Sequence, residues 1–134
     1  MAVSQYNDPC GPIEHFSWGR FVVEGVEHAS TDQGPIGAGK DIRIVGSQVS
    51  PWRERHGHKL MPEMVAGVYD QGVQVLVVGN GVHGLIKVSK TARKAIAAHG
   101  IAHLVVQRTP EACRTYNALS REGLRVALLA HGTC

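Results

Sequence analysis

The segment VQVLVVGNGVHG, residues 73–84, carries the clearest structural signal in this chain. It begins as a short apolar run rich in valine and ends in a loop with three glycines. Strands that are buried on both faces have this composition, and a tight turn commonly follows them. The sequence therefore predicts a central strand over 74–79 whose carboxyl end leads into the glycine loop.

The three glycines have the G-x-G-x-x-G spacing of dinucleotide-binding loops. In those loops a helix begins directly at the glycines, and an acidic residue follows the next strand. Here residues 85–88 separate the loop from Ser89, where the next helix is expected to begin, and Gln107 and Arg108 stand where the acid should be. We therefore predict a plain tight turn, with no dinucleotide and no other cofactor.

Length and composition describe a single globular domain. The chain has 134 residues, of which 43% are hydrophobic and 19% charged, and its net charge is +3. Aromatic residues make up only 5%, and the basic residues are interleaved with acids, so we expect no nucleic-acid partner. We expect no membrane segment or targeting signal and a cytoplasmic location. Residues 1–12 are polar and aperiodic, which predicts a mobile tail before a single domain over 13–134.

The first half of the chain reads as short strands and loops. Alternation of apolar and polar residues predicts strands over 13–17 and 41–45, and a hairpin with strands at 21–23 and 26–28 around Glu24–Gly25. The segments 29–40 and 53–59 are predicted to be surface loops. Trp18 and Trp52 are interpreted as core or pocket-wall residues.

The second half alternates between helices and strands. Helices are predicted from Pro62 to Gly72, from the cap Ser89 to His99, and from the cap Thr109 to Glu122, with strands over 101–107 and 124–130. Strands joined by helices are parallel, with right-handed crossovers. The prediction is an α/β fold: a single compact domain with a mixed sheet, a parallel βαβαβ carboxyl-terminal half and an amino-terminal β-hairpin.

A series of short motifs resembles a known family. In chain order they are Phe16-Ser17-Trp18-Gly19-Arg20, Ser50-Pro51-Trp52-Arg53, Gly57-His58, Val78-Gly79-Asn80-Gly81, Thr109-Pro110-Glu111-Ala112, Tyr116-Asn117 and Gly132-Thr133-Cys134. They are similar to those of the small single-domain family that contains the vertebrate adipogenesis-associated domain protein, archaeal and bacterial relatives, and a mitochondrial complex I assembly factor. The resemblance covers residues 13–134 and implies a compact α/β domain with a mixed sheet. It implies no settled activity.

The histidines and cysteines are the candidate metal ligands and nucleophiles of this chain. His56 and His58 form the only close histidine pair, and no third ligand stands near them, so we predict no bound metal. The three cysteines have unrelated spacings, which argues against disulfides. Cys113 is expected in the core and Cys10 in the tail. Cys134 is expected to be either reactive or packed at the sheet edge, and the sequence assigns no histidine–acid pair to it.

One group of polar residues is expected to meet at a sheet edge. The carboxyl ends of the strands at 101–107 and 124–130 lie on the same edge, which brings Arg108 and Thr109 toward residues 131–134. If the strand at 74–79 is parallel to them, and residues 85–88 do not run back as a full strand, Asn80, Gly81 and His83 arrive there too. Open α/β sheets bind ligands at this edge.

Two functions remain open from the sequence. The first is a non-enzymatic interaction or assembly-factor-like domain, leaning away from an enzyme, that binds a protein partner; a weak homodimer also stays open. Its surface would be formed by Ser50, Pro51, Trp52, Arg53, His58, Gly79, Asn80, Gly81 and His83, with Trp52 as an anchor unless it fills the core. The alternative is a small-anion or small-ligand binding protein or enzyme that uses the edge near Arg108 and Thr109.

Overall fold

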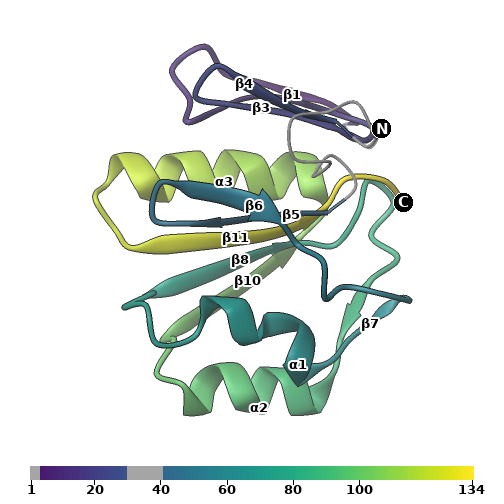
Figure 1. The fold of residues 1–134 in the computed structure, drawn as a ribbon, viewed down its shortest axis with the longest axis vertical. Coiled ribbons are helices and arrows are strands. Elements are labelled where there is room, and N and C mark those ends of the chain that lie inside the picture. Colours follow the sequence, from purple (N-terminus) through teal and green to yellow (C-terminus); the bar gives the residue numbers. More distant parts are fainter. Residues whose placement is uncertain (1–3, 30–40) are drawn as a thin grey trace.

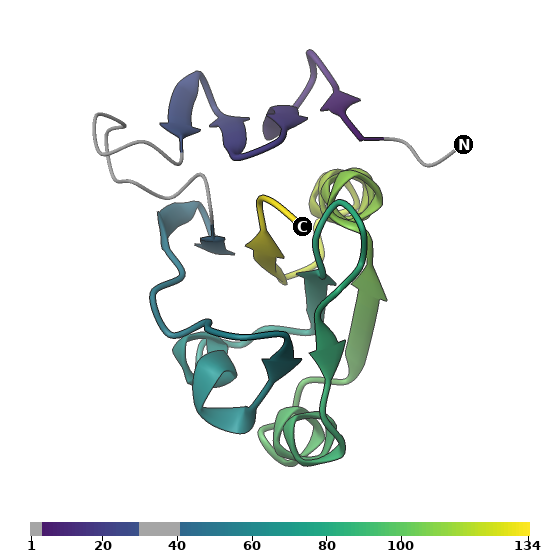
Figure 2. The same ribbon diagram turned by 90° about the vertical axis from the view of Figure 1, so that its right-hand side faces the viewer.

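The computed structural model describes residues 4–29 and 41–134. A five-stranded sheet runs through the middle of the domain (Figure 1). A four-stranded amino-terminal sheet and helix α3 (Thr109–Arg121) lie over one of its faces, and helices α1 (Pro62–Val65) and α2 (Lys90–Ala98) lie under the other (Figures 1 and 2). This is the predicted small α/β domain with a mixed sheet.

The five-stranded sheet combines three parallel strands with an antiparallel pair. Its order is β10 (His103–Gln107), β8 (Val75–Gly79), β11 (Val126–His131), β5 (Asp41–Val45) and β6 (Gln48–Pro51). β8 is parallel to both of its neighbours, and β5 is antiparallel to β11 and β6. Every residue of β8 and β11 is buried, which confirms the strand predicted from the apolar run before the glycine loop.

Two cores lie on the two faces of this sheet because side chains alternate along each strand. Val75 and Val77 face the four-stranded sheet and α3, where they pack with Phe16, Phe21 and Tyr116. The alternate residues of β8 point to the other face. There the core consists mainly of Trp52, Leu60, Met64, Val65, Val68, Leu76, Val78, Ile86, Ile96, Ile101, Ala127 and Leu129.

The amino-terminal sheet contains one strand more than we predicted before residue 30. Its strands are β1 (Tyr6–Asn7), β2 (Ile13–Ser17), β3 (Arg20–Val23) and β4 (Val26–Ala29), in that order. The hairpin turn at Glu24–Gly25 is confirmed, with φ of 48° and 81° at its two residues. The assignment of residues 6–7 to an irregular tail is wrong, because Tyr6 and Asn7 pair with β2.

Side-chain contacts hold this first strand in place. Asp8 accepts hydrogen bonds from the Tyr6 hydroxyl and from the Arg121 guanidinium of α3. These two bonds, the one from Tyr6 first, lower the pKa of the Asp8 carboxyl to about 2. Asn117, also on α3, donates to Tyr6 and to the Ile13 carbonyl. The contacts that hold β1 therefore include some with residues more than one hundred positions away in the chain, and local periodicity does not contain that information.

Two further predictions need correction, and one is mostly untested. β6 was missed, because Pro51 counts against a central strand but is tolerated in this edge strand. The helix predicted from Pro62 to Gly72 is shorter, since α1 passes into a 3₁₀ turn, η1 (Ala66–Val68), and the chain then turns through Asp70 at φ 60°. Most of the predicted loop over 29–40 lies outside the described residues.

The segment between the glycine loop and α2 does not run back as a full strand. Only β9 (Lys87–Val88) is extended, and it pairs in parallel with β7 (Lys59–Leu60) rather than with the large sheet. The glycine loop therefore stays at the carboxyl end of β8. The structure describes no helix that is long and apolar enough to cross a membrane.

Candidate functional site

The carboxyl ends of β8, β10 and β11 meet at one edge of the five-stranded sheet, as the βαβαβ connectivity predicts. The antiparallel strand β5 begins at this same edge, because Asp41 is the register partner of His131. β6 also ends there, since Pro51 pairs with Ile42. We call this the carboxyl-terminal edge; it brings together residues from five separate segments of the chain.

Thr109 ties three of these segments together. Its side chain is fully buried; the hydroxyl accepts a hydrogen bond from the Gly81 amide at 3.0 Å and donates one to the His131 carbonyl at 2.7 Å. The prediction that Thr109 caps its helix is wrong. The N-cap residue of α3 is Arg108, and no side chain caps the helix there. The hydroxyl instead satisfies backbone groups of the β8 loop and of β11.

Gly81 has a steric role in the glycine loop. Its φ is +104°, and a Cβ atom at this position would lie 2.3 Å from the backbone carbonyl of Cys134. The Val82 amide donates to the Thr133 carbonyl at 2.7 Å. Two of the loop amides are therefore used inside the protein, and α2 begins only at Lys90. The glycine allows two backbone segments to approach closely, which requires no bound phosphate.

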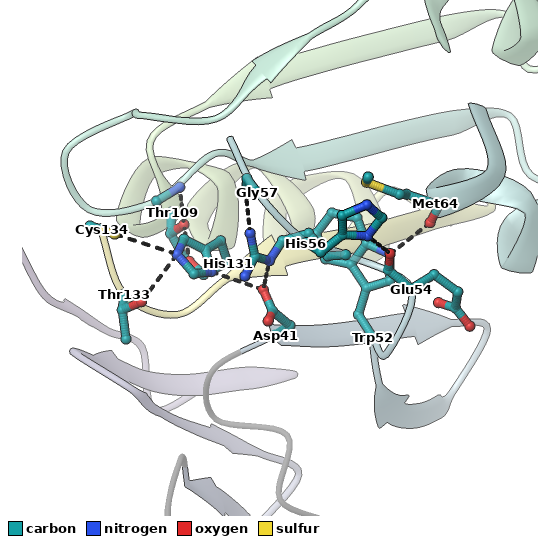
Figure 3. Close-up of polar contacts among 12 residues, drawn as sticks. Asp41, Trp52, Glu54, His56, Gly57, Met64, Thr109, His131, Thr133 and Cys134 are labelled. Atoms are coloured by element: carbon teal, nitrogen blue, oxygen red, sulfur yellow. Dashed lines mark hydrogen bonds and ion pairs between the residues drawn. The ribbon is translucent and has the colours of Figure 1, made fainter. Parts of the chain in front are cut away.

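A buried histidine organises the polar cluster at this edge. The His131 side chain is only 3% exposed, and its Nδ1 lies 2.8 Å from Asp41 Oδ1 (Figure 3). Its Nε2 lies 3.0 Å from Thr133 Oγ1 and 3.8 Å from Cys134 Sγ. Because an ionised carboxylate only accepts hydrogen bonds, Nδ1 is the donor toward Asp41, and in the neutral tautomer with its proton at Nδ1 the other nitrogen, Nε2, is an acceptor.

Arg55 supports the carboxylate from the other side. Its Nε donates to Asp41 Oδ1, and its Nη1 donates to the Gly57 carbonyl at 2.6 Å. The Arg55 side chain is 9% exposed and that of Asp41 is 12% exposed, so the ion pair is largely shielded from water. A carboxylate held by a guanidinium and an imidazole in this way has little freedom to rotate. The orientation of the His131 ring is therefore set by the protein.

The cluster opens onto a shallow hollow of about 370 Å³. Its lining consists of Arg55, Gly57, His58, His131, Thr133 and Cys134. His58, one of the residues predicted for the site, is exposed there, whereas His56 hydrogen-bonds the Glu54 carbonyl. Cys134 and His131 thus both line a space that a small molecule can enter.

The three cysteines occupy different environments. Cys10 is exposed, Cys113 is buried and Cys134 is partly exposed. Burial raises the pKa of the Cys113 thiol far above its ordinary value, so this side chain is an unreactive part of the core, as predicted. A histidine–acid pair, which the sequence did not assign, stands next to Cys134.

Trp52 is a core residue, and its interpretation as a surface anchor is wrong. It is 1% exposed, and its indole Nε1 donates to the Met64 carbonyl of α1 at 2.7 Å. The ring packs in the core on the α1–α2 side of the sheet, so the alternative that Trp52 fills the core is correct. The ring turns inward, whereas Arg53, Glu54 and His56 in the loop that follows are exposed.

Trp18 is exposed, contrary to the core or pocket-wall position that we predicted. It lies in the turn between β2 and β3, is 55% exposed, and has its ring centroid 5.8 Å from that of His83. The turn is fixed by the Gly19 amide, which donates to the Gly132 carbonyl at 2.7 Å. Leu85, which is 46% exposed, is tied to the same region through its amide and the Cys134 carbonyl.

The predicted site residues form two groups at the carboxyl-terminal edge. Gly79, Asn80, Gly81 and Thr109 meet beyond the ends of β8 and β10; Gly84 lies close to the Arg108 and Asn80 side chains. The second group lies at the end of β6, where the Ser50 hydroxyl accepts a hydrogen bond from Arg43 Nε at 3.3 Å and Pro51 ends the strand. Arg53 is exposed beyond it.

Asp41 and Arg55 were absent from the predicted site. Asp41 meets His131 only through the β5–β11 register, and Arg55 reaches it from the loop after Trp52, so spacing along the chain gives no signal for either contact. Within residues 4–29 and 41–134, no group of three or more His, Cys, Asp or Glu side chains is arranged to hold a metal ion.

Fold and site together define a small single-domain α/β protein with a buried polar cluster at the carboxyl-terminal edge of its central sheet. The family described as "Protein of unknown function (DUF498/DUF598)" matches residues 13–131 of the chain. The chain belongs to this family.

Solved structures share the fold at low sequence identity. A conserved hypothetical protein from Pyrococcus horikoshii OT3 is 21% identical with a TM-score of 0.72, over 91% of this chain and 98% of that chain. An outer membrane protein from Bartonella henselae is 21% identical with a TM-score of 0.73, over 92% and 95%. A Mth938-like domain from Bordetella pertussis is 18% identical with a TM-score of 0.57, over 85% and 80%. These similarities concern the fold alone.

Proposed function

We propose that this domain binds a small anionic ligand in the hollow at the carboxyl-terminal edge. The observation that carries the proposal is the buried Arg55–Asp41–His131 cluster that ends at this hollow. Buried charged groups are costly unless they are paired, and here the pairing leaves a histidine and a guanidinium at the wall of an open space. Functional sites commonly combine such groups with a concave surface.

The donors at the wall favour an anion. His58 lines the hollow and is exposed, and among the described residues that line it none has an acidic side chain. Arg55 uses Nε and Nη1 for Asp41 and Gly57; within the described part of the chain its Nη2 makes no hydrogen bond. A guanidinium that is already held in position binds carboxylate or phosphate oxygens without further loss of side-chain freedom.

Titration with acetate and with inorganic phosphate tests the proposal. We expect saturable changes in the NMR ring signals of His58 and His131, while those of His56, two positions from His58, stay unchanged. His58→Ala should weaken the binding and leave the melting temperature unchanged, because this side chain is exposed. If all three histidines respond equally, or none does up to the millimolar range typical of weak ligands, the proposal is wrong.

A protein-binding surface is the second candidate, and the exposed Trp18 favours it. Tryptophan is enriched among the residues that dominate binding energy at protein interfaces. The resemblance to the adipogenesis-associated domain family and to a complex I assembly factor adds support for a non-enzymatic interaction or assembly role. That role now depends on Trp18, His83 and Leu85 rather than on Trp52, which is buried.

Crosslinking of the wild-type protein and of Trp18→Ala in the same cell extract tests this candidate. We expect one discrete crosslinked species that disappears with Trp18→Ala and persists with the matched change Val26→Ala, an exposed apolar residue on β4. A species that survives the loss of Trp18 would contradict this surface.

A further inference from the structure

We infer that Cys134 is a nucleophile that accepts an acyl group from an activated ester or thioester, with His131 as its base. The inference rests on the proposed binding of ligands in the hollow, because the acyl donor must lie there to meet the sulfur. It adds a chemical step to that function and identifies two residues that carry it.

The arrangement has the three parts that nucleophilic catalysis needs: a nucleophile, a base within reach of it, and a group that orients the base. Cys134 Sγ lies 3.8 Å from His131 Nε2, and Asp41 holds the opposite nitrogen of the ring at 2.8 Å. Asp41 is a positioning residue, since it fixes which nitrogen faces the thiol. Cys134 is partly exposed, and it lines the hollow together with His131 and Arg55.

Thr133 competes with the thiol for the same base. Its hydroxyl lies 3.0 Å from Nε2, closer than the sulfur, and the neutral ring has a single acceptor lone pair at this nitrogen. In the structure the Thr133 hydroxyl, and not the more distant thiol, is therefore the main hydrogen-bond partner of His131 Nε2. A thiol is nevertheless the better nucleophile of the two, because thiolate forms near neutral pH and a threonine alkoxide does not.

Transfer of the acyl group to Cys134 needs no reactant other than the acyl donor. The thiol proton moves to Nε2, the sulfur attacks the carbonyl carbon of the donor, and the carbonyl oxygen becomes an oxyanion in the hollow that Arg55 also lines. The oxyanion then collapses, the bond from carbon to the leaving oxygen or sulfur breaks, and the imidazolium returns its proton to the leaving group. The products are an S-acyl Cys134 and a free alcohol or thiol, and water can later hydrolyse the thioester.

Alkylation with iodoacetamide tests the base directly, with the other cysteines as internal controls. At pH 7 we expect Cys134 to react about tenfold faster than the exposed Cys10, and Cys113 not to react in the folded protein. Peptide mass spectrometry measures the three rates in one sample. A Cys134 rate at or below that of Cys10 would overturn the inference.

Two variants separate chemistry from structure. His131→Gln should lower the Cys134 rate to that of Cys10, measured under conditions where circular dichroism shows a folded protein. Thr133→Val removes the competing hydroxyl, so it should raise the Cys134 rate severalfold, which a purely structural role for Thr133 would not produce. An unchanged or lower rate in Thr133→Val would contradict the competition even if His131→Gln fails to fold.

Acyl transfer is measured with p-nitrophenyl acetate. We expect a burst of one p-nitrophenolate per chain, an acetyl group on Cys134, and loss of both in Cys134→Ser. Acetylation located on Thr133, or distributed equally over Cys10 and Cys134, would overturn the inference. In the wild type, saturable acetate binding in the NMR titration without acylation would reject the inference alone, and acylation of Cys134 without saturable anion binding would reject only the proposed function.

Discussion

The two ends of the five-stranded sheet are built differently. At the carboxyl-terminal edge, buried side chains bond the ends of separate segments, as Thr109 does for Gly81 and His131. The opposite, amino-terminal edge has a hollow of about 200 Å³ and a long contact between the Tyr116 hydroxyl and the Gly46 carbonyl, at 3.5 Å. There Arg125 donates to the Gln71 carbonyl from an exposed position.

This difference shows where the chain constrains its geometry. A buried donor or acceptor that loses its partner costs free energy, whereas an exposed one finds water. The carboxyl-terminal edge therefore holds its side chains in fixed positions, as a binding or reactive site requires. The amino-terminal edge has no comparable set of buried polar contacts among the described residues, and substitutions there should be tolerated.

The largest effect is expected at Trp52, which lies just beyond the end of β6 at the carboxyl-terminal edge. Trp52→Ala removes a fully buried ring and leaves a cavity, so the free energy of unfolding should fall by about 3–5 kcal/mol. The matched control Trp18→Ala changes a half-exposed ring and should stay within about 0.5 kcal/mol. Chemical denaturation of both variants measures the difference, and equal losses would contradict the contrast between the two tryptophans.

Thr109→Val comes next. The variant keeps the volume of the side chain but leaves the Gly81 amide and the His131 carbonyl without their partner, which should cost about 2–4 kcal/mol. Thr109→Ser keeps the hydroxyl and should recover most of the loss. If valine is tolerated within a few tenths of a kcal/mol, this bridge does not hold the edge together.

The next prediction concerns the pH dependence of stability, and it depends on a buried histidine that lies at neither edge of the five-stranded sheet. His28 on β4 is 4% exposed, and burial lowers its pKa below the ordinary value of 6.5. Between that lowered pKa and 6.5 the unfolded chain binds more protons than the folded one, so stability is lost as pH falls through this window.

The melting temperature should therefore decline from pH 7.5 toward pH 5. His28→Phe should reduce the slope without abolishing it, because burial lowers the pKa of His15 as well. The exposed His56→Ala is the control and should leave the slope unchanged. A slope identical in the wild type and in His28→Phe would show that His28 does not contribute.

The smallest effect is expected at the amino-terminal edge. Tyr116→Phe removes a hydroxyl whose bond to the Gly46 carbonyl is long, and the stability should change by less than about 0.5 kcal/mol. Thermal denaturation of Tyr116→Phe and Thr109→Val under the same conditions compares the stability lost at the two edges. A loss as large as that of Thr109→Val would mean that the two edges are equally constrained.

Much of the fold could be predicted because its signals are local. The apolar run of β8, the turn at Glu24–Gly25 and the cap of α2 are each encoded within a few residues, and all are confirmed; the Ser89 hydroxyl accepts from the Ala92 amide at 3.0 Å. Strand–helix alternation then fixes the direction of the three parallel strands. β1 and β6 were missed, because a two-residue strand and a proline-containing edge strand give weak periodicity.

The candidate site was predicted only in outline. The meeting of Gly81, Thr109 and the segment around His131 follows from parallel topology and is confirmed. The predicted role of Thr109 was wrong because its hydroxyl can hydrogen-bond either to its own helix or to two nearby backbone groups. Tertiary packing determines which partners it takes. The positions of Trp18 and Trp52 were also misjudged, since a tryptophan beside charged residues can turn either way.

By itself, the amino-acid sequence determined the class of fold, the central buried strand and the edge at which the polar residues gather, because hydrophobic periodicity, helix starts and glycine turns act over short distances. Only the tertiary structure decided that Asp41 and Arg55 stand behind His131, and that His131 faces Cys134. Those contacts depend on the register between β5 and β11 and on where a loop folds back. That information lies in the packing of segments about 90 residues apart, and no local pattern contains it.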